Sequence, residues 1–143
     1  MEHKTKKIVI GATLFFITLF LAGCIPSGGG PSGPANSGEF VKGAVVRGFP
    51  PVPVIEGAQV IESYGDGQSM QYGASFISDK GLSGVVEYYR GVLPQTGWES
   101  NVYQNSQDNM FFDIKNPKFQ GTIIVNKAAN REKIAIMVSV EPR

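Results

Sequence analysis

Residues 69–98 read SMQYGASFISDKGLSGVVEYYRGVLPQTGW, and they carry a strand pattern followed directly by a helix pattern. Apolar and polar side chains alternate over residues 69–77, which predicts a half-buried strand whose inner face carries Met70, Tyr72, Ala74 and Phe76. From Leu82 to Leu93 the apolar residues instead recur at spacings of three and four, which predicts a helix with one buried face. Each element is apolar on one side only, so both faces must be buried in a common core.

The ends of the predicted helix carry typical boundary residues. Ser78 or Asp79 is placed to cap the N-terminus, and Pro94 disturbs the last turn. Gly97 supplies the left-handed residue that commonly ends a helix, and Trp98 follows at a position from which it can pack back across the helix end.

Short strand patterns lie on both sides of this stretch. Residues 58–64 are predicted to form a hairpin with residues 69–77 around the turn Gly65-Asp66-Gly67. Four further strands are predicted at 98–104, 109–115, 120–127 and 133–140. Short links between successive strands favour antiparallel pairing. The sequence therefore predicts an α+β fold, an antiparallel sheet in the order β-β-α-β-β-β-β with one helix packed on one face.

The globular domain is predicted to span residues 54–143, and residues 39–53 are predicted to be an extended segment that leads into it. Pro50-Pro51-Val52-Pro53 favours a polyproline-like backbone, and one short strand is expected near residues 44–47. Two hypotheses concern the sheet face that the helix leaves uncovered. Either this face is a partner surface, or residues 40–49 fold over it.

The first 23 residues (1–23) have the build of a secretory signal peptide. Basic residues precede an apolar run that begins at Ile8, and small residues close the segment. The alternative is an uncleaved transmembrane anchor. Residues 8–23 are only 16 in number, whereas a helix needs about 20 residues to cross the hydrocarbon core. Cleavage is therefore the favoured prediction.

Leu21-Ala22-Gly23-Cys24 ends this apolar run and resembles the lipobox of bacterial lipoproteins. The resemblance implies that diacylglycerol is attached to the Cys24 sulfur, that the chain is cleaved before Cys24, and that the new N-terminus is acylated, for example with palmitate. Two or three acyl chains would anchor the chain stably. Ile25 stands where Asp often marks inner-membrane retention. This implies the outer membrane of a two-membrane bacterium, or otherwise the outer face of the cytoplasmic membrane.

Residues 24–38 are predicted to be the lipidated cysteine and a flexible tether. Gly, Pro and Ser make up 11 of the 14 residues from 25 to 38, a composition that builds no core and gives a typical span of roughly 20 Å. Such a tether would hold the domain close to the membrane.

Loss of the signal peptide would remove the only histidine, His3, together with three lysines and one glutamate. Ten basic and eleven acidic side chains would remain, without the basic excess expected of a nucleic-acid-binding protein. With lipid on Cys24, the mature domain would have no histidine and no free thiol. This excludes histidine-dependent triads, thiol nucleophiles and zinc sites built from imidazole or thiolate. No cofactor and no metal are predicted.

A second resemblance covers about residues 53–140. The entry at 53–58 (Pro-Val-Ile-Glu-Gly-Ala), the pair Tyr88-Tyr89 and the closing Gly97-Trp98 are similar to those of small bacterial envelope-lipoprotein domains. Those domains carry no assigned activity as a group. The resemblance therefore implies the fold and transfers no functional residue.

Strand alternation also gives candidate contact residues. If Phe112 points inward, Phe111 points to the open face, as do Ala135 and Met137 on the last strand, and Tyr103 joins them. An exposed apolar patch of this kind marks a partner surface.

Five basic residues gather around the last two predicted turns and offer a rim for an envelope protein, anionic lipid or an anionic cell-wall polymer: Lys115, Lys118, Lys127, Arg131 and Lys133. The alternative is ordinary solvation, with lysines protecting strand edges. Asp113 and Glu132 dilute the patch.

The leading hypothesis is a non-catalytic, lipid-anchored envelope module that binds another protein or an envelope polymer through its sheet face or C-terminal turns. A purely structural role is a further hypothesis. The competing hypothesis is a hydrolase that acts on an envelope polymer with two carboxylates, or with Ser and Lys, brought together by the fold. The acidic residues are scattered along the chain, and their spacing matches neither a paired-carboxylate pattern nor a calcium loop.

Overall fold

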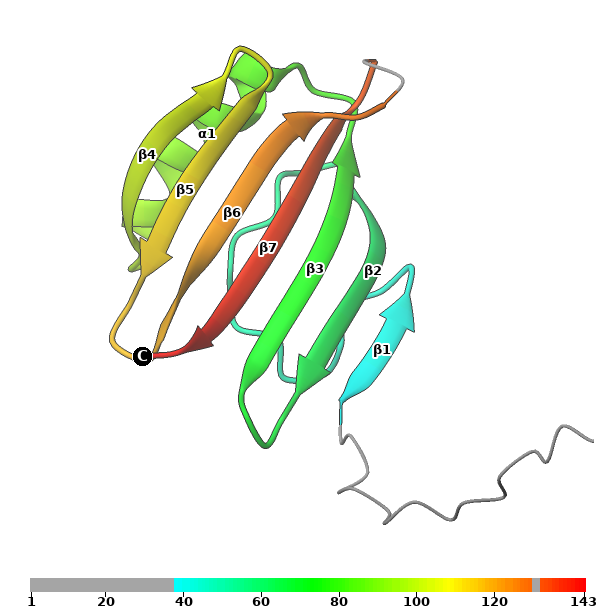
Figure 1. The fold of residues 1–143 in the computed structure, drawn as a ribbon, viewed down its shortest axis with the longest axis vertical. Coiled ribbons are helices and arrows are strands. Elements are labelled where there is room, and N and C mark those ends of the chain that lie inside the picture. Colours follow the sequence, from blue (N-terminus) through cyan, green and yellow to red (C-terminus); the bar gives the residue numbers. More distant parts are fainter. Residues whose placement is uncertain (1–37, 130–131) are drawn as a thin grey trace, which may run out of the picture. The chain divides into compact units, whose positions relative to one another are not determined.

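The computed structural model describes residues 38–129 and 132–143. Within them lie seven strands and one helix: β1 (Glu39–Lys42), β2 (Gln59–Asp66), β3 (Gln71–Ser78), α1 (Leu82–Gln95), β4 (Glu99–Ser106), β5 (Asn109–Lys115), β6 (Phe119–Lys127) and β7 (Ile134–Pro142). The strands make one sheet in the order β1-β2-β3-β7-β6-β5-β4 (Figure 1). Every neighbouring pair is antiparallel. The predicted antiparallel sheet with one helix is confirmed in this coarse form, and strands dominate it.

The last strand, β7, lies in the middle of the sheet. It pairs with β3 on one side and with β6 on the other. The helix carries the chain from β3 to the far border of the sheet, where β4 begins, and β5, β6 and β7 return step by step toward β3 (Figure 1). The C-terminal strand therefore joins the β1–β3 part of the sheet to the β4–β6 part.

Helix α1 lies over β4, β5 and β6 on the inner face of the sheet (Figure 1). Its buried residues are Val85, Val86, Tyr89 and Leu93, in agreement with the predicted spacing. The predicted end is also confirmed, because Gly97 has a φ of 83° and the Trp98 amide donates a 2.9 Å hydrogen bond to the Leu93 carbonyl. Trp98 itself is buried.

The predicted N-terminal cap is wrong. Ser78 is the last residue of β3, and the helix begins after Gly81, which has no side chain to donate or accept a capping hydrogen bond. The Ser78 hydroxyl instead accepts a hydrogen bond from the Lys80 amide within the connecting loop. The cause is that β3 runs further than the alternation suggested, because Ser78 still pairs with Ile134 of β7.

Residues 43–58, the covering segment, pack on the part of the inner face that α1 leaves free. Val46, Val52 and Ile55 are buried, and the latter two belong to the same core cluster as Trp98. The indole N–H of Trp98 donates to the Pro51 carbonyl at 3.3 Å. The domain thus includes residues 39–53, which the sequence placed ahead of it. The strand expected at 44–47 does not form, and β1 lies just before it.

The turn between β2 and β3 also differs from the prediction. Gly65 and Asp66 belong to β2, and the turn occupies residues 67–70, so Met70 is exposed with a φ of 53° rather than facing the core. A register shift between Val60 and Glu62 precedes this change. Gly65 faces inward, where a Cβ would stand 2.7 Å from a Val46 methyl group, so the close approach of the covering segment requires glycine.

Candidate functional site

The sheet face opposite α1 and the covering segment is the open face, and its side chains line up in rows across the strands. One row is largely polar and crosses the sheet from β4 to β1 through Asn101, Asp113, Thr122, Ser139, Gly73, Tyr64 and Phe40. Phe40 and Tyr64 are exposed, whereas Val46 and Phe49 pack on the inner side. Residues 40–49 therefore do not fold over this face.

The neighbouring row is mostly apolar and contains the predicted contact residues. It joins Tyr103, Phe111, Ile124 and Met137 on the four strands β4, β5, β6 and β7. The rings of Tyr103 and Phe111 are stacked, with centroids 5.2 Å apart and an angle of 4° between their planes. Met137 is 40% exposed and Tyr103 44%. The structure thus brings Phe111, Met137 and Tyr103 together as the alternation predicted.

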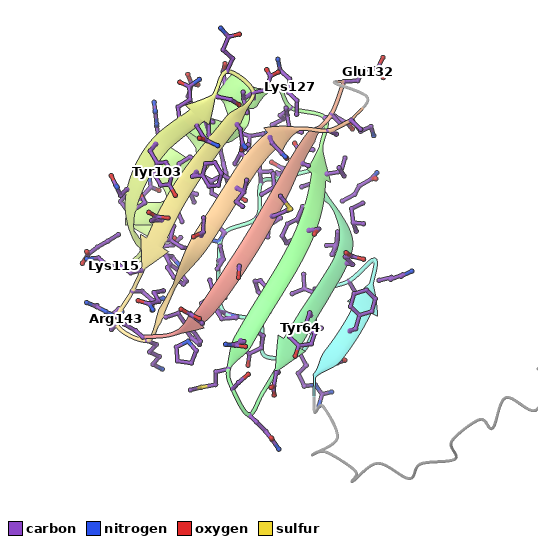
Figure 2. The ribbon with its side chains drawn as sticks, viewed as in Figure 1. Tyr64, Tyr103, Lys115, Lys127, Glu132 and Arg143 are labelled. Atoms are coloured by element: carbon purple, nitrogen blue, oxygen red, sulfur yellow. The ribbon has the colours of Figure 1, made fainter. Side chains whose placement is uncertain are left out.

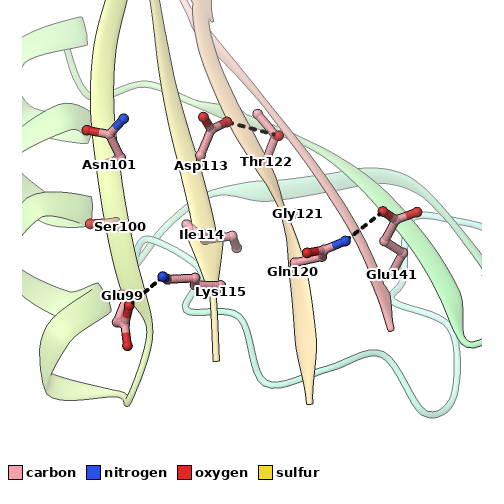
Figure 3. Close-up of a pocket in the computed structure, with 10 residues that line it drawn as sticks. All are labelled: Glu99, Ser100, Asn101, Asp113, Ile114, Lys115, Gln120, Gly121, Thr122 and Glu141. Atoms are coloured by element: carbon pink, nitrogen blue, oxygen red, sulfur yellow. Dashed lines mark hydrogen bonds and ion pairs between the residues drawn. The ribbon is translucent and has the colours of Figure 1, made fainter. Parts of the chain in front are cut away.

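A hollow of about 530 Å³ lies beside this apolar row, at the end of the sheet where β5 turns into β6. Its lining residues come from four adjacent strands, β4 to β7, and Figure 3 labels all of them: Glu99, Ser100, Asn101, Asp113, Ile114, Lys115, Gln120, Gly121, Thr122 and Glu141. The lining residues carry carboxylates, amides, hydroxyl groups and one ammonium group. Such a mixture contains both hydrogen-bond donors and acceptors.

Hydrogen bonds and one ion pair organise these side chains. Lys115 Nζ lies 2.9 Å from Glu99 Oε2, and the hydrogen bond and positive charge of Lys115 lower the pKa of Glu99. Gln120 donates its side-chain amide to Glu141 Oε1 at 3.2 Å (Figure 3).

Asp113 lines the hollow on the side of the apolar row and contacts both rows. Its Oδ1 accepts hydrogen bonds of 3.4 Å from the hydroxyl groups of Thr122 and Tyr103. Desolvation, followed by the negative charge of Asp113, raises the pKa of Tyr103. Both effects favour the neutral phenol, whose O–H donates to Asp113.

A second hollow of about 290 Å³ shares Glu141 with the first. Its other lining residues belong to β2, β3 and β7, and they include Tyr64, Gly73 and Ser139 of the polar row. We name these two adjoining hollows the open-face groove, and their lining residues come from the strands between β4 and β2.

The five predicted basic residues do not form one rim. Lys115 and Lys127 lie at opposite ends of the β5–β6 hairpin (Figure 2). Lys118 lies in the turn beside Lys115, and its carbonyl accepts a hydrogen bond from the Arg143 amide. Lys133 forms a 3.0 Å ion pair with Asp79, and Lys127 forms one with Asp108. Arg131 lies outside the described residues. The prediction failed because the two turns point to opposite ends of the antiparallel strands.

Other predicted sites lie outside the described residues, or form no cluster within them. The signal peptide, Cys24 and the rest of the tether up to residue 37 lie outside the described residues. Across residues 38–129 and 132–143, no three His, Cys, Asp or Glu side chains are grouped so that they could hold a metal ion. No helix in the same residues has the length and apolar character needed to span a bilayer. Comparison with family models, curated proteins and solved structures gave no match for the chain.

The groove itself was not predicted from the sequence. A signal was present, since the outward positions of the predicted strands become polar or charged toward one end, as at Asp113, Lys115 and Gln120. Alternation gives the face of each residue but not which strands are neighbours. Because β7 inserts between β3 and β6, Glu141 and Gly73 join the groove only through pairings that the chain order does not reveal.

Proposed function

We propose that this protein is a lipid-anchored module of a bacterial envelope and that it binds a hydroxyl-rich polymer, a glycan, in the open-face groove. The observation that carries the binding function is the groove: two adjoining hollows that share Glu141 and follow a polar row across the sheet. The anchor is supported by the signal-peptide pattern and by the Leu-Ala-Gly-Cys sequence that ends at Cys24.

The chemistry of the groove favours a glycan. Sugar hydroxyls both donate and accept hydrogen bonds, and they match a surface on which Asn101 and Gln120 offer amides while Asp113 offers carboxylate oxygens. Sugar rings also present apolar C–H faces. The stacked pair Tyr103–Phe111 lies in the next row and offers aromatic surface with one polar hydroxyl.

The charge of the groove bears on the kind of polymer. Three of the four ionised groups in the larger hollow are acidic, and the fourth, Lys115, is paired with Glu99. This balance favours a neutral or amino-bearing glycan over the anionic polymer that the basic residues first suggested.

The hydrolase hypothesis has less support from the groove. A general acid that works near neutral pH needs a raised pKa. Glu99 is the lining carboxyl with a resolved shift, and Lys115 moves its pKa down. Binding without chemistry is therefore the function that we favour.

The anchor can be tested by mass spectrometry of the chain purified from membranes. The expected mass corresponds to a chain that begins at Cys24 and carries two or three acyl groups. An intact Met1 with a free Cys24 thiol would contradict the anchor and leave the groove proposal standing.

The groove can be tested by sedimentation of the full chain with insoluble bacterial cell-wall sacculi. We expect the wild type to sediment with them and Asp113→Asn to bind about tenfold more weakly. A tenfold loss corresponds to roughly 1.4 kcal/mol, the size expected for one charge-assisted hydrogen bond. Glu87→Gln is the matched control, because Glu87 is an exposed carboxylate on α1, away from the groove. Binding by Asp113→Asn as strong as that of the wild type would contradict the proposed glycan site. Capture of an envelope protein through a photocrosslinker at position 103, without sacculus binding, would favour a protein ligand.

A further inference from the structure

The two borders of the sheet differ in how well they are protected. β1 has four residues and ends at Lys42, whereas β4 has eight and forms the opposite border (Figure 1). Proteins commonly protect a border strand with Lys, Pro or short length. β4 reads ESNVYQNS, with no Lys, no Pro and a single charged residue, Glu99. Among the described strands, β5 is its one partner.

The hydrogen-bond pattern identifies which backbone groups of β4 face outward. The Asn116 amide bonds to the Phe119 carbonyl across the β5–β6 turn, so Asn116 faces β6 and, by alternation, Lys115, Asp113 and Phe111 face β4. Their partners on β4 are Glu99, Asn101 and Tyr103. The intervening residues Ser100, Val102 and Gln104 therefore direct their N–H and C=O groups to the outer border.

We propose that β4 pairs with β4 of a second copy of this chain, antiparallel and about a two-fold axis at Val102. Residues whose backbone groups point to the outer border must then lie opposite one another across the axis. This register meets that requirement, because Val102 lies opposite its counterpart and Ser100 lies opposite Gln104 of the other copy. The result is one continuous sheet through both copies.

Side chains support a second copy as the occupant. Val102 is partly buried on the inner side and meets the same apolar residue. On the open face Tyr103 stands opposite Asn101. Glu99 comes level with Asn105, a neutral residue at the irregularity between Gln104 and Ser106. The strand's one charge therefore meets no like charge, as a self-complementary border requires.

The pairing also favours an assembly that stops at two copies. It uses the long border of each copy, and the remaining border, β1, offers only four residues for further addition. The two open faces become one surface with the two grooves on the same side. The pairing does not depend on what the groove binds, so it stands or falls separately from the proposed function.

Disulfide trapping in cells that express the full chain tests the register. Hydrogen-bonded antiparallel residues have Cα atoms about 5.5 Å apart, within the range of a disulfide. Val102→Cys is therefore expected to give a band at twice the monomer mass on non-reducing gels after mild oxidation. Ser100→Cys is the matched control: two copies of residue 100 would lie about 14 Å apart, so its dimer band should be at least about tenfold weaker. The wild type, with Cys24 alone, sets the background.

Two further variants keep the test decisive. Ser100→Cys with Gln104→Cys should restore the dimer band, because these residues meet across the axis. Ser100→Pro in the Val102→Cys chain should remove most of it, because proline deletes an outward N–H that β5 does not use. No band from Val102→Cys and from the double variant, or equal bands from Val102→Cys and Ser100→Cys alone, would overturn the pairing.

Discussion

The inner and open faces of the sheet are built from alternate residues of the same strands, yet they obey different constraints. Phe112 on β5 is fully buried between α1 and its neighbours, and its ring centroid lies 5.7 Å from that of Tyr89. Phe111, the preceding residue, stands on the open face and stacks on Tyr103. Folding requires the inner residues to be apolar and well packed. It requires much less of the open face, so side chains there can vary with little effect on stability.

The largest difference between the faces should appear on β5 itself. Phe112→Ala removes a fully buried ring and should lower the free energy of unfolding by about 3–5 kcal/mol. Phe111→Ala removes a ring from a partly exposed stack and should cost about 1 kcal/mol. Urea denaturation followed by circular dichroism measures both. Equal losses would show that a further part of the protein covers the open face.

Glycines give a second contrast, of intermediate size. A methyl group on Gly121 of β6 would overlap the Ser139 carbonyl oxygen and stand 2.8 Å from the Val140 Cα, both backbone atoms of β7. Gly121→Ala should therefore destabilise the protein by about 2 kcal/mol. Gly84→Ala, at an exposed helix position with open space around it, should stabilise it by about 0.5–1 kcal/mol. Thermal melts of both variants check the signs, and a stabilising Gly121→Ala would contradict the close approach of β6 and β7.

The same two constraints explain how much could be predicted from the sequence. Alternation placed Phe111 outward and Phe112 inward, and helical spacing gave the buried face of α1, because burial leaves a period in the chain. The covering segment has no period. Its residues Val46 and Val52 reach the core through an irregular backbone with positive φ at Gly43, Gly48 and Gly57, so its contribution became visible only in three dimensions.

The candidate site could likewise be predicted only in part. The aromatic pair could be predicted because Tyr103 and Phe111 lie on successive strands joined by a short turn. The prediction of one basic rim was wrong, because the β5–β6 turn and the β6–β7 turn are close in sequence but lie at opposite ends of the strands. The groove depends on β7 lying between β3 and β6, a pairing of residues more than 50 positions apart along the chain for Tyr72 and Val140.

Tyr89 is a buried inner-face residue that carries a polar group. Its ring is fully buried, and its hydroxyl finds no hydrogen-bond partner among the described residues. An unsatisfied buried hydroxyl costs free energy, so Tyr89→Phe should keep the packing and stabilise the protein by about 1 kcal/mol. A loss of stability in a urea melt would show that the hydroxyl has a partner after all.

The same residue predicts a response to alkali. Burial, followed by the charge of Tyr88, raises the pKa of Tyr89 well above its ordinary value of 10.0. The neutral phenol is therefore favoured in the folded state. The stabilisation that comes from burying the neutral phenol is fully present below the pKa of the unfolded state. It is lost as the pH rises above about 10. Wild-type stability should fall there, and Tyr89→Phe should reduce that fall.

The smallest effect on stability is expected at the open face, from the ion pair between Glu99 and Lys115. Both side chains are at least half exposed, so Glu99→Gln should leave the melting temperature at pH 7 nearly unchanged. Lys115 lowers the pKa of Glu99, so any contribution is present above the unfolded pKa and disappears as pH falls through the folded pKa, in the acid range. Wild type and Glu99→Gln should therefore melt alike at pH 3 and differ little at pH 7. A large loss at pH 7 would mean that this pair holds β4 to β5, and the open face would then be under a folding constraint as strong as that on the inner face.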